Sequence, residues 1–463
     1  MAQKREMPKR KPRPRLYLRS KIYLRLAIAV AALALISNLA GARIVGALNG
    51  MEDVPFAPAL AGFGLIAFCS LACAYGTRGT SLPSFVVAIA FGIAGHALFA
   101  PIIANQTALA ALVTASAAVI LFSGGLEMTL REFLRLSVKI ALLALPGVLI
   151  TGFAFSSLLS GLSVATGTAV AMPVIIILGA TLASTDPAAI IPVLQGLRFK
   201  KRETKDIIIA ESAVNDVAGA LLTTVFLKVP LAGLTIATAY AALATRSNFI
   251  FLAEQIGYGV VAGIVTWLLL ALHSLVKKRQ KQPYGADQMF FLAMPVVAFT
   301  GAAIGGSGFL AAFIAGLLFQ TKDHMIEIEH FFQEVIDGLA KPMIFLLVGA
   351  LVDVPSMLRY APIGIAAALL FMFVLRPAMV FLMLGPYALF RKKPWGLSVR
   401  QLLFFSFVRE TGAIPAVLLI TVLGRMTGNT QGLVEIGMWV ILLTLVIAPP
   451  FTPYVARRLG VAE

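Results

Sequence analysis

The sequence has 463 residues, of which 59% are hydrophobic and 13% are charged, and it carries a formal net charge of +17. A soluble domain is roughly 45–50% apolar and about 25% charged, so this composition, with a mean hydropathy of +0.92, excludes a chain that folds in water. We therefore expect a helical protein whose solvent is the lipid bilayer.

The positive charge lies in short clusters between apolar segments. The basic stretch from Lys4 to Arg25 is followed by clusters at Arg131–Lys139, Arg198–Lys205, Lys277–Lys281, Arg391–Arg400 and Arg457–Arg458. This distribution is typical of the cytoplasmic loops of membrane proteins, with anionic headgroups as a further partner, and it does not favour binding of nucleic acid. The apolar run from Leu26 to Leu48 is too long for a signal peptide, so we expect an uncleaved first helix.

Apolar runs predict fourteen membrane-spanning helices. The first seven lie near residues 22–47, 57–76, 83–104, 107–128, 134–160, 166–196 and 206–228. The other seven lie near residues 249–275, 287–305, 307–320, 336–353, 361–390, 399–424 and 431–456. The apolar stretch 231–247 is expected to stay on the outer side, because a crossing there would divide the basic clusters between the two faces of the membrane.

These helices divide the chain into four parts. Residues 1–21 form a basic cytoplasmic tail, and residues 22–56 form an additional N-terminal helix with an outer loop. Residues 57–456 form the main transmembrane domain, and residues 457–463 form a short cytoplasmic tail. Because the number of crossings is even, we expect both termini in the cytoplasm and a multi-pass protein of the cytoplasmic (inner) membrane.

Two of the predicted helices carry prolines and charged residues in mid-membrane. One contains GATLASTDPAAIIPVL, with Asp186 before a proline, and the other contains FSFVRETGAIPAVLLI, with Arg409 and Glu410. Proline removes a backbone donor and clashes with the preceding turn, so we expect both helices to be broken. A bilayer tolerates broken backbone only where protein or a water-filled cavity surrounds it.

The two breaks lie seven helices apart. We therefore predict an all-α polytopic membrane protein of two inverted six-helix repeats, with crossed broken helices at an ion site near the midplane. The repeats would be the second to seventh and the ninth to fourteenth helices, joined by the eighth.

The helix predicted at 206–228 carries four polar residues within six positions, namely Glu211, Ser212, Asn215 and Asp216. A charged group at the bilayer centre costs about 2.5–3.5 kcal/mol on insertion scales, so this pattern indicates function. Residues three and four apart share one face of a helix, which makes Ser212 a neighbour of Asp216 and Glu211 a neighbour of Asn215.

The preceding helix would add further oxygen atoms at the Thr185–Asp186 break. Together with the carboxylate, hydroxyl and amide groups of the next helix, they form the kind of ligand set that hard alkali cations prefer. We expect Asp216 to hold either a proton or a metal ion, but not both at once. Such competition, combined with an alternating cavity, is sufficient for antiport without enzymatic chemistry or a cofactor.

The remaining buried charges are expected to have structural roles. A buried carboxylate needs a buried cation, and Arg376 in FVLRPAMV is the expected partner of Glu211. We expect Arg409 and Glu410 to offset the exposed helix ends at the second break. Asp186 either does the same at the first break or serves as an ion ligand, and the sequence leaves the two roles open.

The quoted residues resemble those of a known family. ASTDPAA, followed about 25 residues later by ESAVNDV, is similar to the paired signature of the monovalent cation:proton antiporter superfamily, and its Asn-Asp form resembles the sodium/proton exchanger branch. LFSGGLEMTLREFLR, FLAAFIAGLLF and PMIFLLVGALVD also fit. The resemblance covers nearly the whole transmembrane region.

The resemblance implies specific roles and a specific architecture. Asp216 would be the ion and proton carrier beside Asn215, and Ser212 and Thr185 would supply ion ligands. Glu211 and Arg376 would form a stabilising ion pair. The implied fold is a homodimer in which a six-helix core domain moves against a dimerisation domain, and exchange in this branch is usually electroneutral.

Two positions depart from the family pattern. Ser123 in LFSGG stands where many relatives carry an acidic residue, which removes one possible negative ligand. RETGAIP replaces the commoner Arg-Gly arrangement, so that Glu410 is an additional buried acid. No nucleotide-binding regulatory domain follows the last helix, and gating by such a domain is not expected.

We therefore expect one-for-one exchange of Na⁺ or K⁺ for H⁺. One alternative is a sodium-coupled organic-solute symporter of similar fold, which would need a larger polar cavity. The other is a non-transporting membrane sensor, which would bind a cation without net flux. Polar residues that merely hold helices together are the simplest structural alternative for this constellation.

Overall fold

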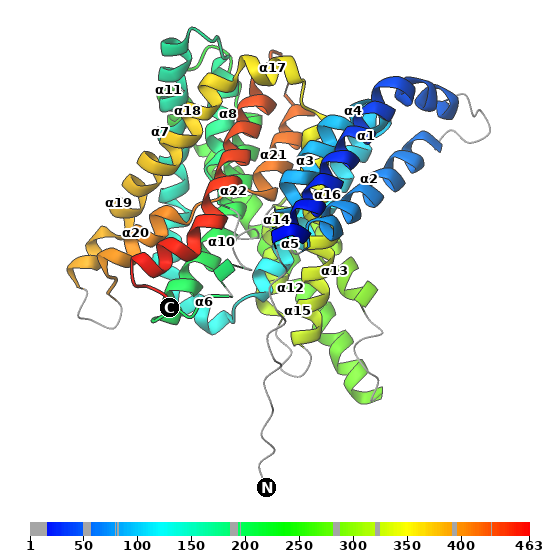
Figure 1. Ribbon diagram of the computed structural model, residues 1–463. Coiled ribbons are helices and arrows are strands. Elements are labelled where there is room, and N and C mark those ends of the chain that lie inside the picture. Colours follow the sequence, from blue (N-terminus) through cyan, green and yellow to red (C-terminus); the bar gives the residue numbers. More distant parts are fainter. Residues whose placement is uncertain are drawn as a thin grey trace.

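The computed structural model is built from helices, with one isolated bridge between Phe199 and Ala462 among its described residues (Figure 1). The structure describes residues 16–49, 57–78, 80, 83–185, 193–194, 196–280, 288–319, 325–390, 396–426 and 428–463. Asp186 and the prolines that follow it in the first predicted break lie outside these ranges.

The helices of the first half of the chain are α1 (Leu16–Asn49), α2 (Ala57–Gly76), α3 (Ser84–Ala94), α4 (His96–Ala104), α5 (Gln106–Leu126), α6 (Leu130–Ala144), α7 (Pro146–Thr166), α8 (Met172–Leu182) and α10 (Arg202–Lys228). Those that follow are α11 (Ile236–Ala242), α12 (Arg246–Gln280), α13 (Gln288–Ala302), α14 (Gly308–Leu318), α15 (Met325–Val335), α16 (Lys341–Ala350), α17 (Val354–Arg359), α18 (Ala361–Leu370), α19 (Arg376–Leu389), α20 (Val399–Phe407), α21 (Ala413–Leu423) and α22 (Leu433–Arg458). Two π-helical segments, η3 (Ile336–Ala340) and η4 (Phe371–Leu375), precede α16 and α19.

Eight helical spans within the described ranges are long and apolar enough to cross a membrane. α3 and α4 form a further candidate span that is bent by 89° at Gly95, whereas the sequence predicts one helix over 83–104. Four shorter apolar helices lie at Met172–Leu182, Phe290–Ala302, Gly308–Leu318 and Ala413–Leu423. The predicted total of fourteen crossings remains a prediction.

Three described basic segments, in α6, before α10 and at the end of α22, lie together at one end of the molecule. α6, α20 and the C-terminus share the lower end in Figure 1, whereas α11 and α17 lie at the upper end. The backbone N–H groups of Lys200 and Glu463 donate to Val461 O and Arg198 O, both at 3.0 Å, which joins the C-terminal residues to the segment before α10. α11 has seven residues, too few to span a bilayer, in agreement with the expectation that 231–247 does not cross.

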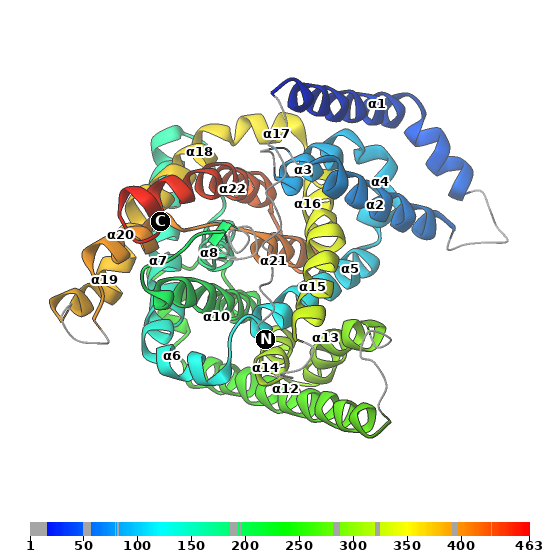
Figure 2. The same cartoon turned by 60° about the horizontal axis from the view of Figure 1, so that its bottom comes forward.

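α1 is an additional helix at the edge of the molecule. Figure 2 shows it outside α3 and α4, with α12 along the opposite edge. Its contacts to the rest of the chain include Ser37 Oγ, which accepts a hydrogen bond from Ala97 N at 3.2 Å. Large apolar side chains such as Leu39 and Leu268 are exposed on α1 and α12, as expected for faces that contact lipid.

Two glycine pairs allow helix backbones to cross in direct contact. A Cβ atom on Gly125 of α5 would lie 2.6 Å from Leu317 N of α14, and one on Gly316 would lie 2.9 Å from Phe122 C. At a second crossing, a Cβ atom on Gly92 of α3 would lie 2.7 Å from Ala350 N of α16. Small residues at such crossings allow close van der Waals packing, the main contribution to helix association in membranes.

Prolines explain the two π-helical segments. Pro342 and Pro377 each stand in the first turn of an α-helix, directly after Lys341 and Arg376. Because proline cannot donate a hydrogen bond and clashes with the carbonyl four residues earlier, the helix widens for one turn before it. η4 directly precedes Arg376, which is the first residue of α19.

We expect Gly316→Ala to lower stability by about 1–3 kcal/mol, because the added methyl overlaps the α5 backbone, which cannot move aside as a flexible side chain can. The apparent Tm of the detergent-purified protein, measured by size-exclusion chromatography after heating, tests this expectation. Gly161→Ala on α7 is the matched control, since no atom lies within 4 Å of its added Cβ. Equal Tm values for both variants would show that the crossing tolerates a side chain.

Candidate functional site

Two interrupted helices meet in the interior of the protein. α8 ends at Leu182. α20 ends at Phe407, and five residues separate it from α21, which begins at Ala413. The described residues of both interruptions are buried, including Thr185 in the first and Thr411 in the second. α10 runs beside both interruptions, and α8, α10 and α21 lie near the centre of Figure 2.

Arg409 of the second interruption stabilises the end of α8. Its Nη2 donates to the carbonyl oxygens of Leu182 at 2.9 Å and Ala183 at 3.2 Å, while its guanidinium carbon lies 3.9 Å from the ring centroid of Phe371. The last carbonyls of a helix lack intrahelical partners and carry partial negative charge, so a cation is favourable there. The observed contacts of Arg409 reach the first interruption, although we expected it to serve the second.

The backbone of the second interruption is held by α22. Thr411 N donates to Thr444 Oγ1 at 3.1 Å, and this hydroxyl donates to Ile441 O at 3.0 Å. An amide without such a partner in this environment would cost several kcal/mol. Glu410 is buried beside Arg409 in the same segment.

Glu211 and Arg376 form a buried ion pair with two parallel hydrogen bonds. Arg376 Nη1 and Nη2 donate to Glu211 Oε1 and Oε2 at 2.8 and 2.9 Å, and Arg376 Nε donates to Phe405 O at 3.3 Å. The planar guanidinium matches the carboxylate in this geometry, which lysine cannot reproduce. The pair joins α10 to α19 and α20, and the two predicted partners do contact each other.

Ser212 and Asn215 connect α10 to the first interruption. Ser212 Oγ donates to Thr185 O, and Asn215 Nδ2 donates to Thr185 Oγ1 at 3.0 Å and to Glu211 Oε1 at 2.6 Å. A Cβ atom on Gly219 would lie 2.9 Å from Ser184 Cβ, so the helix and the interruption remain close over two turns. The structure thus brings together the neutral oxygen ligands that the sequence predicts.

Asp216 is 1% exposed and lies on α10 directly after Asn215. Ser123 of α5 is also buried, and a Cβ atom on the adjacent Gly124 would lie 3.5 Å from Ala213 Cβ, which places this part of α5 against α10. Within the ranges that the structure describes, no group of three or more His, Cys, Asp or Glu residues is arranged to hold a metal ion. The polar groups in this region are hydroxyl, amide and carboxylate groups.

Several residues of this region are not predictable from the sequence pattern. Phe371 under the Arg409 guanidinium and Thr444 under the Thr411 amide are ordinary residues of apolar helices. A signal for the first exists in retrospect, because Phe371 begins the π-helical turn that precedes the Arg376–Pro377 pair. Nothing in the local sequence distinguishes Thr444 from other membrane threonines, which often bond to their own helix.

Comparison with known proteins assigns the class. Residues 64–458 match the sodium/hydrogen exchanger transmembrane family, and the chain belongs to that family. The match begins within α2 and ends at the last residue of α22, so it includes both interrupted helices and α10.

The sequence identity between this chain and individual relatives is low. The chain is 26% identical over 277 residues to the K(+)/H(+) antiporter NhaP2 of Shewanella sp. (strain ANA-3), covering 59% of this chain and 45% of that protein. It is 28% identical over 310 residues to the K(+)/H(+) antiporter NhaP of Alkalimonas amylolytica, covering 65% of this chain and 49% of that protein. The chain thus spans about half the length of the curated relatives it matches.

A solved structure supports the fold over nearly the whole chain. The sodium proton antiporter MjNhaP1 from Methanocaldococcus jannaschii at pH 8 has a TM-score of 0.57 and 21% sequence identity, covering 95% of this chain and 99% of that one. The predicted superfamily is therefore confirmed, and the all-helical membrane fold agrees with this neighbour.

We expect Arg376→Met to cost about 3–5 kcal/mol, because it leaves Glu211 buried without its cation. The double variant Glu211→Gln/Arg376→Met should recover part of this loss, since neither charge then remains. Apparent Tm values of the wild type, Glu211→Gln, Arg376→Met and the double variant test the coupling. Asp353→Asn, which keeps an N-cap acceptor at an exposed position before α17, should change stability by less than about 1 kcal/mol. Strictly additive losses at Glu211 and Arg376 would argue against the pair.

Proposed function

We propose that this protein is a secondary antiporter that exchanges a monovalent cation, Na⁺ or K⁺, for H⁺. The observation that carries the proposal is the convergence of Ser212 and Asn215 on Thr185, with Asp216 buried beside them on α10. Membership of the sodium/hydrogen exchanger family supports this activity, as do relatives named as K(+)/H(+) antiporters and the Na(+)/H(+) antiporter 1 of Methanocaldococcus jannaschii.

In this proposal Asp216 binds H⁺ and the cation alternately. The hydroxyls of Ser212 and Thr185 supply neutral ligands, and Asn215 contributes its Oδ1, which accepts no hydrogen bond from any described residue. Asp186 adds a further ligand or offsets the end of α8, and these two roles stay alternatives. One carboxylate loaded with either H⁺ or a monovalent cation carries the same net charge, which is the physical reason to propose electroneutral, one-for-one exchange.

The remaining charged and polar positions have supporting roles. The Glu211–Arg376 pair holds α10 in place, and Arg409 with Glu410 offsets the charge of the interrupted helices. Because position 123 is serine where many relatives carry an acidic residue, α5 offers no second negative ligand there. Asp216 is then the main acidic group for the cation.

We also propose that the architecture consists of two inverted six-helix repeats within fourteen crossings. The two glycine crossings support this symmetry, because α5 packs on α14 as α16 packs on α3. In each half the sequence order is the same, with α3 before α5 and α14 before α16. α8 with its interruption and the α20–α21 pair are then equivalent broken helices.

This architecture suggests how transport proceeds. Residues 57–456 form the exchanger domain, after an additional helix at 22–56, with the basic segments 1–21 and 457–463 in the cytoplasm. A six-helix core that contains α8, α10 and α20–α22 moves against a dimerisation domain in the cytoplasmic membrane. A homodimer provides the fixed frame for this movement.

We expect Asp216→Asn to reduce cation-dependent proton movement to the level of protein-free liposomes, because an amide cannot release a proton. Proteoliposomes with an imposed pH gradient and an internal pH-sensitive dye measure this movement after addition of Na⁺ or K⁺. Asp353→Asn, the same change of charge at an exposed position outside the site, should retain transport. Unchanged exchange by a monodisperse Asp216→Asn sample would falsify the carrier assignment.

Transport should not respond to membrane potential if exchange is one-for-one. A net charge that crosses about 100 mV exchanges roughly 2.3 kcal/mol with the field, enough to alter the rate many-fold. Na⁺-driven proton movement is therefore compared in vesicles clamped with valinomycin at zero and at negative potential. Equal rates are the expected result, and a strong voltage dependence would favour electrogenic exchange that recruits a second acid such as Glu410.

A further inference from the structure

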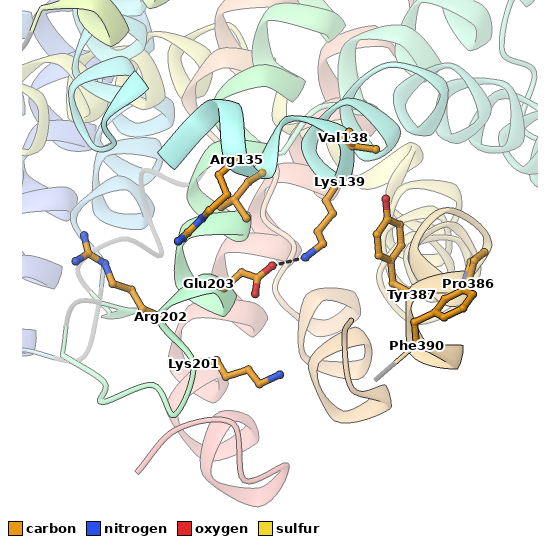
Figure 3. Close-up of a pocket in the computed structure, with 10 residues that line it drawn as sticks. Arg135, Val138, Lys139, Lys201, Arg202, Glu203, Pro386, Tyr387 and Phe390 are labelled. Carbon is orange, nitrogen blue, oxygen red and sulfur yellow. Dashed lines mark hydrogen bonds and ion pairs between the residues drawn. The ribbon is translucent and has the colours of Figure 1, made fainter. Parts of the chain in front are cut away.

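A charged cavity lies at the end of the molecule that contains α6 and the C-terminus. It has a volume of about 860 Å³ and lies between α6, the start of α10 and the end of α19 (Figure 3). This volume falls within the roughly 300–1,000 Å³ that is typical of ligand sites. None of its lining residues belongs to the proposed cation site.

One side of the cavity is basic. Arg135, Lys139, Lys201 and Arg202 line it, and Glu203 is the only acidic residue among the described residues of that lining. Lys139 pairs with Glu203, and Arg202 pairs with Glu132 and Asp206. Arg135 and Lys201 are exposed and form no ion pair with any described residue. Arg135 also attracts the nearby Glu132 carboxylate, but its exposed guanidinium remains accessible to a further anion.

The start of α10 adds to the attraction for an anion. Lys201 is the N-cap residue of this 27-residue helix, and its side chain makes no capping hydrogen bond. The first N–H groups of a helix lack intrahelical acceptors and carry partial positive charge, so an acceptor oxygen at this position is favourable.

The opposite side of the cavity is apolar. Figure 3 shows Tyr387, Pro386 and Phe390 together across the cavity from Glu203 and Arg202. Phe390 and Val138 are exposed at its rim, as expected of side chains that contact lipid chains. A free inorganic anion would leave this apolar wall without a partner.

The three helices that line the cavity contact one another through Lys139. Lys139 of α6 pairs with Glu203 of α10, and its Nζ lies 5.6 Å from the ring centroid of Tyr387 on α19. These contacts fix the basic and the apolar side at a defined separation. We propose that the cavity binds the phosphate headgroup of an anionic phospholipid, with Arg135 and Lys201 on the phosphate and an acyl chain along Val138 and Phe390.

Native mass spectrometry of the detergent-purified full chain tests this site with phosphatidylglycerol and with phosphatidylcholine of identical acyl chains. We expect retention of phosphatidylglycerol and about 25-fold weaker binding by Arg135→Ala/Lys201→Ala, since each basic residue near the surface contributes roughly fivefold. The control is Arg457→Ala/Arg458→Ala, which removes the same charge from exposed residues at the same end of the molecule. Its phosphatidylglycerol affinity should match that of the wild type.

Three outcomes would overturn the proposal. Equal loss of phosphatidylglycerol in both double variants would indicate general charge attraction without a site. Equal retention of phosphatidylcholine would show that the headgroup charge does not matter. Competition by inorganic phosphate alone, at the concentration of the lipid, would identify a soluble anion as the ligand. Because binding rather than transport is measured, the result does not depend on the proposed antiport.

Discussion

The structure depends on how backbone groups released by the two helix interruptions are satisfied in a region without bulk water. The carbonyls at the end of α8 accept hydrogen bonds from Arg409, which belongs to the other interruption. The amide of Thr411 in that second interruption donates to Thr444 of α22. Each interruption is therefore stabilised by an element that is distant in sequence, and neither broken helix could persist alone in lipid.

Some features were predictable because physics leaves few alternatives. The composition requires a membrane protein, and charged residues next to prolines indicate the two interruptions, whereas α22 stays helical through Pro449, Pro450 and Pro453. A buried carboxylate requires a buried cation, so the Glu211–Arg376 pair follows from the small number of intramembrane charges. The helical period correctly indicates that Asn215 lies next to Glu211. The roles of Asp216, Ser212 and Thr185 in ion binding remain proposals.

Other features were not predictable from this sequence. Backbone carbonyls have no sequence signature, so the partner of Arg409 could not be identified in advance. The 89° bend at Gly95 falls at a Gly-His pair in an otherwise apolar segment, and this local pattern does not by itself specify a bend. The glycine crossings depend on which helices become neighbours, a property of the whole fold. Local pattern thus predicts elements and charges better than it predicts contacts across the bundle.

Asn215 connects the candidate site to two neighbouring parts of the structure. A single amide nitrogen donates to Thr185 in the interruption and to Glu211, whose carboxylate is held by Arg376. Any displacement of Thr185 or of α10 therefore changes the hydrogen bonds of Asn215 at both ends. Through this one side chain the first interruption is connected to the ion pair that joins α10 to α19.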